Sequence, residues 1–393
     1  MVDKNIAQTL LTEPALNLLN EIDQSELGDE LALSSRLRKT HPPELVSACI
    51  SQAKLRQKAE KKFGPFATKM LFTKEGLEQS TRLTVAAQRV PRYQQAGIES
   101  IVDLGCGLGG DAMAFASYGM NVTAIELDEV AAAFAQFNTS RLGINVIHQN
   151  AEEVEIESHS AFFADPARRK ASGNKQRVSK YEYSPSLDWL INEVAAKKPT
   201  AIKLGPADDY KQFGDEFDYE WISDSGELVE LTLYSKQLRG ELIRQARLLS
   251  KGEVHVFGAN SFISEKPDVR EIEKYIYEPD ASLIRSGLMG EYAIENGMGL
   301  IDEKIAYLTS DELIKSPWLR GFEILEEWPF DEKLIAKELK ARSIGILEIK
   351  KRGVDLIPEQ FRKKVKLSGK GAASLIVTKR GDTRVALLGK PIH

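Results

Sequence analysis

Asp103, Glu126 and a group of glycines lie within one short stretch of the sequence, residues 98 to 128. Asp103 stands in an apolar run, and Glu126 follows it by 23 residues, after a second apolar run. Four glycines follow Asp103 closely: Gly105, Gly107, Gly109 and Gly110. Because glycines have no Cβ atom, they allow a sharp turn and let a ligand approach the backbone. A carboxylate at the spacing of Glu126 can accept hydrogen bonds from both hydroxyls of a ribose, so the stretch predicts a ligand that contains a nucleoside.

The glycine spacing alone leaves two kinds of ligand open. Gly105, Gly107 and Gly110 fit the G-x-G-x-x-G pattern, which is also found in sites for nicotinamide and flavin dinucleotides. Asp103 decides between them, since it stands two residues before the first glycine. Its carboxylate would repel a pyrophosphate and attract a cationic ligand that carries an amino group. The residues therefore favour a cationic ligand over a dinucleotide.

The segments VDLGCGLGG and AIELD resemble motifs I and II of the class I S-adenosylmethionine-dependent methyltransferases. The resemblance implies S-adenosyl-L-methionine as the cofactor, with Asp103 by its methionine end and Glu126 holding its ribose. Its other predicted cofactor-binding residues in these two motifs are Gly105, Cys106, Gly107 and Leu127. Without the resemblance, Cys106 is interpreted only as a small side chain in the turn.

An Asp-Pro pair follows a later apolar run, in the segment AFFADPARR. Asp165 and Pro166 are expected at the carboxyl end of a strand, where open α/β sheets bind ligands. The pair resembles motif IV, [DNS]-P-P-[YFW], of methyltransferases that modify exocyclic amines. The resemblance implies that Asp165 and a neighbouring carbonyl accept hydrogen bonds from the target amine, while Pro166 stiffens the loop. A simple turn that begins with Asp-Pro is the alternative.

The tetrad departs from the family pattern at its last two positions. Ala167 stands where the family has a second proline, and Arg168 stands where it has an aromatic residue that stacks on the target base. A guanidinium plane can stack on a base or bind a phosphate. The predicted catalytic residues are Asp165, Pro166 and Arg168, with an amine as the favoured acceptor.

Two further segments extend the predicted cofactor site. Residues 77–81, LEQST, are similar to the L-x-Q-y-x-T segment of amino-methyltransferases that act on nucleic acids, although Ser80 replaces the aromatic residue. This implies contacts of Gln79 and Thr81 with the methionine part of the cofactor; an ordinary helix entry is the alternative. Asn150 and Ala151 follow the third predicted strand. By the same family resemblance they would contact the adenine, where Asp is the more familiar residue.

Apolar runs and helical periodicity predict the elements that position these residues. Strands are expected at 98–104, 122–125, 144–147, 161–164 and 201–204, with strand-like alternation at 217–221 and 228–233 and a last strand at 253–258. The fold class is α/β, with a Rossmann-like seven-stranded sheet of the class I methyltransferase type. The expected domains are a helical region (1–95), a catalytic domain (96–258) and an α+β module (259–393).

Basic residues gather in two places outside the predicted site. The loop from Arg168 to Lys180 holds six Lys or Arg and no acid, and Tyr181 and Tyr183 follow it. Residues 341–393 hold thirteen Lys or Arg and four Asp or Glu, a net charge of +9 in a chain of net charge −5. Basic loops and tyrosines can bind phosphates and stack on bases. RNA is the predicted partner, through the loop 168–180 and the C-terminal module; a merely solvated basic surface is the alternative.

The C-terminal module, residues 259–393, resembles the THUMP-like domain attached to a group of bacterial class I methyltransferases. Its expected elements are a strand in WLRGFEILEEWPF, a helix in DEKLIAKELKARS and a closing hairpin across Arg380–Thr383. THUMP domains proper bind RNA, mostly tRNA. The resemblance therefore implies an RNA partner, with tRNA and rRNA both open.

Composition limits the number of domains, the cellular location and the metal content that can be expected. The chain has 393 residues, 42% of them hydrophobic, which is room for two or three domains. No apolar run reaches 18 residues and the N-terminus lacks a signal-peptide pattern, so no membrane association is expected. The two cysteines, Cys49 and Cys106, lie in unrelated contexts and favour the cytoplasm. Five scattered histidines show no ligand spacing, so no metal is expected; the oligomeric state stays open.

The first hypothesis is an S-adenosylmethionine-dependent methyltransferase that acts on an RNA base, with an exocyclic amine favoured. The second is a methyltransferase of small molecules or proteins, whose basic tail has another purpose. The third is a non-catalytic protein that binds S-adenosylmethionine, and a dehydrogenase is the outsider. The sequence leaves the RNA, the nucleotide and the modified atom open.

Overall fold

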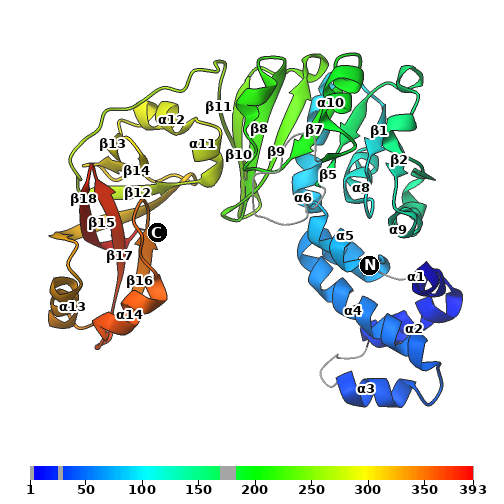
Figure 1. The fold of residues 1–393 in the computed structure, drawn as a ribbon, viewed down its shortest axis with the longest axis horizontal. Helices are drawn as coiled ribbons and strands as arrows, with labels where there is room; N and C mark the ends of the chain where they lie inside the picture. The colour runs from blue at the N-terminus through cyan, green and yellow to red at the C-terminus, as the bar shows by residue number, and fades with distance from the viewer. Residues whose placement is uncertain (1–3, 25–29, 169–182, 393) are drawn as a thin grey trace. The chain divides into compact units, whose positions relative to one another are not determined.

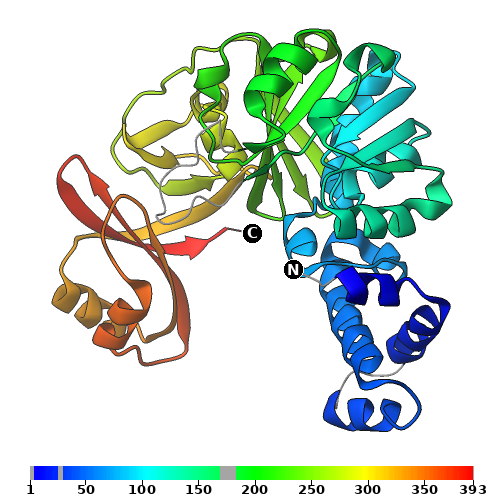
Figure 2. The ribbon, with the colours of Figure 1, turned by 45° about the vertical axis from the view of Figure 1, so that its right-hand side comes forward.

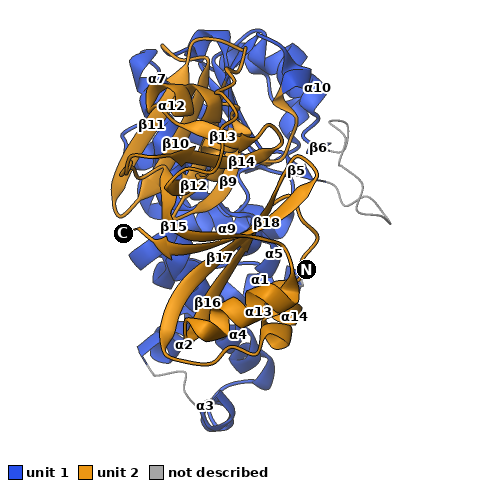
Figure 3. Ribbon diagram, turned by 90° about the vertical axis from the view of Figure 1, so that its left-hand side faces the viewer, with its two compact units in different colours: residues 1–204, 211–218, 232–240 blue, residues 205–210, 219–231, 241–393 orange. Residues whose placement is uncertain are grey.

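The computed structural model describes residues 4–24, 30–168 and 183–392. Most of the predicted basic loop, residues 169–180, and Tyr181 lie outside the described residues. The chain divides into two compact units, shown in different colours in Figure 3. Unit 1 comprises residues 1–204, 211–218 and 232–240, and unit 2 comprises residues 205–210, 219–231 and 241–393.

Five parallel strands form the sheet of unit 1 (Figure 1). In spatial order they are β7 (Thr200–Leu204), β4 (Phe162–Ala164), β1 (Ser100–Leu104), β2 (Asn121–Glu126) and β3 (Asn145–His148). The last four residues of β1 are buried, as expected for a parallel strand covered on both faces. One of these four is Asp103, a charged residue in an otherwise apolar strand interior.

Among the described residues the complete sheet has nine strands, two more than the seven predicted. The order is β11-β10-β8-β9-β7-β4-β1-β2-β3, with four strands not yet named: β8 (Phe217–Asp224), β9 (Glu227–Ser235), β10 (Arg244–Ser250) and β11 (Glu253–Ala259). The sequence reading missed β10, which pairs parallel with β8 and antiparallel with β11. Two arginines interrupt its apolar pattern. Arg244 is buried against Glu291 at 2.6 Å, and Arg247 lies 2.9 Å from Glu220.

The N-terminal helices gather at one end of the α/β part of unit 1 (Figure 2). They are α1 (Lys4–Leu10), α2 (Glu13–Gln24), α3 (Glu30–Leu37) and α4 (Pro43–Phe63). Their apolar faces share one core with Leu108 of the glycine turn, Met113 and Phe134. Gln52 of α4 donates to the Phe72 carbonyl (2.7 Å) and accepts from its N–H (3.0 Å). The helical region therefore packs directly against the predicted cofactor turn.

Two helices flank the predicted cofactor turn within unit 1. Helix α8 (Gly110–Ser117) begins directly after Gly109, and α9 (Glu129–Thr139) begins after Asp128. Asp128 caps α9 by accepting a hydrogen bond from the Ala131 N–H at 2.8 Å. Because α8 starts at the carboxyl end of β1, its free N–H groups face the turn.

Unit 2 contains a second sheet of seven strands, in the order β13-β14-β12-β15-β18-β17-β16. Their bounds are β12 Tyr275–Pro279, β13 Gly299–Asp302, β14 Ile305–Ser310, β15 Leu319–Pro329, β16 Ile344–Lys351, β17 Gly371–Arg380 and β18 Thr383–Pro391. Helices α13 (Glu332–Ala341) and α14 (Pro358–Val365) share a core with β16, β17 and β18. The predicted hairpin is confirmed, since Arg380 pairs with Thr383.

Candidate functional site

The glycine turn joins β1 to α8 in a backbone conformation that favours glycine. Gly105 (φ +83°), Gly107 (φ +56°) and Gly109 (φ +87°) are left-handed. A Cβ atom on Gly109 would lie 2.7 Å from the Thr139 side chain, whereas one on Gly107 would meet no atom within 4 Å. The turn is anchored to β2, because the N–H groups of Gly105 and Cys106 both donate to the Ile125 carbonyl. Open space at Gly107 is where a ligand can approach the backbone.

Asp103 lies fully buried beneath this turn. Neither of its carboxylate oxygens has a hydrogen-bond partner among the described residues. Burial raises the pKa of Asp103 well above its usual range, and the carboxylates of Asp111, Asp165 and Glu126 raise it further, against an opposing effect of Arg89. A buried carboxylate without a partner is costly. A ligand amine would supply the missing donor and balance the surplus negative charge, so this end of the turn fits a cationic ligand.

Arg89 is a buried neighbour of Asp103 that the sequence analysis missed. Its guanidinium donates to the Asp111 carboxylate and lies over the Phe163 ring, 4.6 Å from the centroid. Asp111 thus holds the positive charge of Arg89 in the floor of the site. The sequence around Arg89 does not show that it is buried, because its partner Asp111 is 22 residues away.

Glu126, predicted to hold the ribose, lies at the end of β2. Its two carboxylate oxygens accept hydrogen bonds from the N–H groups of Gly107 and Asp128, each at 2.8 Å. Burial raises the pKa of Glu126, although these two bonds act in the other direction. Each carboxylate oxygen can accept a second hydrogen bond. The ribose role of Glu126 is therefore compatible with its place at the turn and stays a proposal.

The other residues predicted for the nucleoside part lie after β2 and β3. Leu127 is 57% exposed, and its carbonyl contacts His148 Nε2 at 3.0 Å. Ala151 is buried, and the Asn150 side chain caps a short helix by accepting from the Glu152 N–H at 3.2 Å. The N–H of Gln149 donates to the Glu126 carbonyl, so this loop lies beside the end of β2. The Asn150 amide oxygen can accept a second hydrogen bond beside the cap, so it can still accept one from the adenine amine.

Asp165 follows β4 directly and lies against the glycine turn. Its N–H donates to the Leu104 carbonyl (3.3 Å), and a Cβ atom on Gly105 would lie 3.4 Å from its carbonyl oxygen. Lys203 of β7 places Nζ 2.5 Å from Asp165 Oδ2. Pro166 is buried beside it. The parallel strands β1, β4 and β7 thus bring Asp103, Asp165 and Lys203 to one edge of the sheet.

Arg168 and the LEQST segment take different positions. Arg168 is exposed on the short strand β5 (Ala167–Arg168), and its Nε donates to the Tyr183 hydroxyl at 3.0 Å. Gln79 is exposed at the end of α5 (Lys74–Gln79). Thr81 is buried, and its hydroxyl accepts a hydrogen bond from Lys203 at 2.9 Å. Of the two residues predicted in this segment, Thr81 contacts the site through Lys203. The role of Gln79 stays a prediction.

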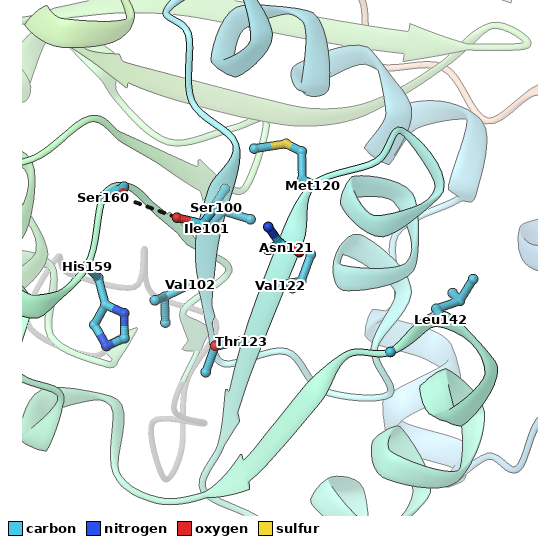
Figure 4. A pocket seen from close by; sticks show the side chains of 11 residues that line it. Ser100, Ile101, Val102, Met120, Asn121, Val122, Thr123, Leu142, His159 and Ser160 are labelled. Carbon is cyan, nitrogen blue, oxygen red and sulfur yellow. Dashed lines mark hydrogen bonds between the residues drawn. The ribbon is translucent and has the colours of Figure 1, made fainter.

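A separate cavity of about 170 Å³ lies at the amino ends of β1 and β2 (Figure 4). Its lining includes Ser100 at the start of β1, Asn121 at the start of β2, and His159. The glycine turn lies at the carboxyl ends of the same two strands. This cavity is therefore on the opposite edge of the sheet from the predicted cofactor residues.

Comparisons with known proteins decide the family. The chain is 32% identical over 340 residues to an uncharacterized S-adenosylmethionine-dependent methyltransferase found in two strains of Mycobacterium tuberculosis. The match covers 83% of this chain and 91% of the relative. The chain belongs to the S-adenosylmethionine-dependent methyltransferases. Its cofactor is S-adenosyl-L-methionine, which sets the dehydrogenase hypothesis aside, and the orphaned Asp103 and the open face of Gly107 fit that cationic group.

A family model agrees with this assignment, and a solved structure shares the fold. A methyltransferase domain matches residues 102–163, a THUMP domain-like family matches 319–391, and a domain of unknown function (DUF8688) matches 5–59 of this methyltransferase. A proposed methyltransferase of Porphyromonas gingivalis W83 has the same fold, with a TM-score of 0.77 at 20% identity and full coverage of both chains. No helix among the described residues has the length and apolar character to cross a membrane.

Replacing Gly107 by alanine tests whether the cofactor approaches this part of the turn. Gly97 gives a matched control, since it also has positive φ (+71°) and open space around its Cβ position. Both substitutions are expected to lower the free energy of unfolding by about 1–2 kcal/mol through backbone strain. Only Gly107→Ala is expected to weaken S-adenosylmethionine binding as well, by about tenfold, the equivalent of ~1.4 kcal/mol. Calorimetric titration measures the affinity of both variants for S-adenosylmethionine. Equal affinities of the two variants would show that the cofactor does not approach Gly107.

Proposed function

We propose that this methyltransferase modifies a base of an RNA, with an exocyclic amine as the favoured acceptor. The observation that carries the proposal is the position of Asp165 and Pro166 at the carboxyl end of β4, against the glycine turn. A carboxylate beside the methyl-donor turn can accept hydrogen bonds from an amine and orient its lone pair. Pro166 supports this role, because its fixed φ limits the freedom of the loop.

Methyl transfer depends mainly on the relative position of the methyl donor and the acceptor. S-adenosylmethionine, when bound, supplies a methyl group on a sulfonium centre. Asp103, the turn glycines and Glu126 are the proposed contacts for that group, with Thr81, Asn150 and Ala151 beside them. Asp165 would hold the acceptor amine in line with the methyl group. Holding two reactants in the reactive arrangement can remove a large part of the activation barrier. An amine needs no strong base, since it can lose its proton after attack.

The proposal of an RNA partner rests on the C-terminal module. The THUMP domain-like match covers residues 319–391, and THUMP domains proper bind RNA. Several basic side chains there are held in ion pairs, such as Arg342 with Glu326 and Lys364 with Glu332. Lys363, Lys366 and Lys370 are exposed on and just after α14. These exposed ammonium groups support contact with phosphates. A cytoplasmic location is part of the same proposal.

Transfer of a labelled methyl group separates the three hypotheses. The protein is incubated with labelled S-adenosylmethionine and an extract of cells that lack it, and label is measured in RNA, protein and small-molecule fractions. Label in RNA is the expected result. Label in protein or small molecules supports the second hypothesis, and tight cofactor binding without transfer to any fraction supports a non-catalytic binding protein.

Salt dependence tests the proposed phosphate contacts. The double variant Lys363→Glu/Lys366→Glu is expected to weaken binding of total RNA and to lower the slope of log K against log [salt] by about 0.7–0.9 per lost contact. The control Lys304→Glu/Lys315→Glu changes charge equally at two other exposed positions of unit 2. Filter binding at several salt concentrations measures both. Equal losses in the two double variants would show that net charge alone, rather than α14, governs RNA binding.

A further inference from the structure

Lys203 connects the donor and acceptor sides of the proposed site. Its Nζ atom lies 2.5 Å from Asp165 Oδ2 and 2.9 Å from Thr81 Oγ1. Its side chain is 13% exposed and that of Asp165 is 31% exposed, so the ammonium group is better shielded from water than the carboxylate. Charge-assisted hydrogen bonds of this kind are stronger than neutral ones and fix the geometry of both partners. Three segments far apart in the chain therefore meet at one ammonium group.

The segment that carries Thr81 is fixed independently at its other end. Lys62 of α4 donates to the carbonyls of Leu77 (2.8 Å), Glu78 (2.8 Å) and Ser80 (2.7 Å). The Thr81 carbonyl in turn lies 3.6 Å from the Cβ position of Gly110, at the start of α8. Thr81 is thus held between α4 and the glycine turn, and it gives Lys203 a rigid anchor on the donor side.

Lys203 also offsets negative charge at this edge of the sheet. Asp165 is one of the carboxylates that raise the pKa of the buried Asp103. Without the ammonium group, Asp165 would lose the ion pair that offsets its repulsion from that carboxylate. Repulsion and free rotation would then move Asp165 away from its present place.

We propose that Lys203 is a positioning residue for methyl transfer. It holds the Asp165 carboxylate toward the acceptor and ties it to Thr81, so that donor and acceptor keep a fixed spacing. The inference rests on the proposed role of Asp165. Small displacements matter here, since a misplacement of about 1 Å can cost about 10²-fold in rate.

The test compares Lys203→Met, Asp165→Ala and the double variant. Lys203→Met is expected to lower kcat for methyl transfer to the RNA fraction labelled by the natural protein about 10²-fold, with the Kd of S-adenosylmethionine within about threefold. The double variant should lose no more activity than Asp165→Ala alone, because Lys203 acts through Asp165. Lys203→Arg, which keeps the charge, should restore part of kcat. Lys198→Met, which removes a lysine paired with Glu157, is the control and should keep full activity.

Additive losses in the double variant, or a kcat of Lys203→Met equal to that of the natural protein, would overturn the inference. A parallel loss of cofactor affinity would also overturn it, since it would place Lys203 in cofactor binding. Thermal unfolding of the same variants tests the contact between Lys203 and Asp165 independently of activity. The Tm of the double variant should fall by less than the sum of the two single losses. If the natural protein labels no RNA, the proposed function fails, and additive Tm losses would still overturn the Lys203 contact.

Discussion

Replacing Asp165 by alanine is expected to lower kcat for methyl transfer about 10²- to 10³-fold and to leave the Kd of S-adenosylmethionine within about threefold. The reason is the position of the side chain. Asp165 lies at the carboxyl end of β4, paired with Lys203, while the buried floor of the turn is formed by Asp103 and Arg89. Asp165 would therefore touch the acceptor rather than the cofactor.

Two further variants sharpen this prediction. Asp165→Asn keeps the shape and one acceptor oxygen but loses the charge-assisted pair with Lys203, so its activity should fall between those of the natural protein and Asp165→Ala. Asp215→Ala removes an exposed carboxylate elsewhere in unit 1 and should leave both constants unchanged. Steady-state kinetics and calorimetric titration give the two constants. An equal loss of kcat and of cofactor affinity in Asp165→Ala would contradict the acceptor role.

Replacing Asp103 by asparagine is expected to weaken S-adenosylmethionine binding about 10- to 100-fold, since a hydrogen bond to a charged group contributes ~1.5–3 kcal/mol. The same change should raise the Tm of the cofactor-free protein, because it removes a buried carboxylate that has no partner among the described residues. Calorimetric titration and thermal unfolding measure the two effects. A variant that is both less stable and unchanged in affinity would show that Asp103 serves the fold alone.

The raised pKa of Asp103 also predicts the direction of a pH dependence. The unfolded carboxyl titrates near pH ~3.9, and the folded one above it. The contribution of Asp103 to stability is therefore complete below the unfolded pKa and is lost as the pH rises through the folded pKa. Cofactor binding favours the carboxylate, so the affinity should rise with pH in the same window, with release of a proton. Asp103→Asn should flatten both dependences; a wild-type slope in the variant would assign them to another group.

Local segments of this fold were predictable from the sequence, and long-range pairs were not. The strand, the glycine turn and the spacing to Glu126 lie within 31 consecutive residues, so their pattern is visible without the fold. Asp165 was placed near them because the carboxyl ends of parallel strands meet at one edge of a sheet. The roles of these residues stay predictions.

The sequence analysis failed where charged residues are satisfied from a distance. Strand β10 escaped detection because Arg244 and Arg247 break its apolar pattern, and their acidic partners lie 47 and 27 residues away. Arg89 was invisible as a member of the site for the same reason. Arg168 contacts the Tyr183 hydroxyl, and its predicted contact with a base or a phosphate stays a prediction. A partner on a neighbouring strand or loop leaves no trace in a single sequence.

The most direct test of the central claim is nucleoside mass spectrometry of RNA from cells that lack this protein, after incubation with S-adenosylmethionine carrying a deuterated methyl group. One base nucleoside with the deuterated methyl on an exocyclic nitrogen is the predicted product, and Asp165→Ala should fail to form it. A methyl group on a ribose oxygen, or on a ring carbon, would contradict the role given to Asp165. Unlabelled RNA together with labelled protein would contradict the RNA assignment itself.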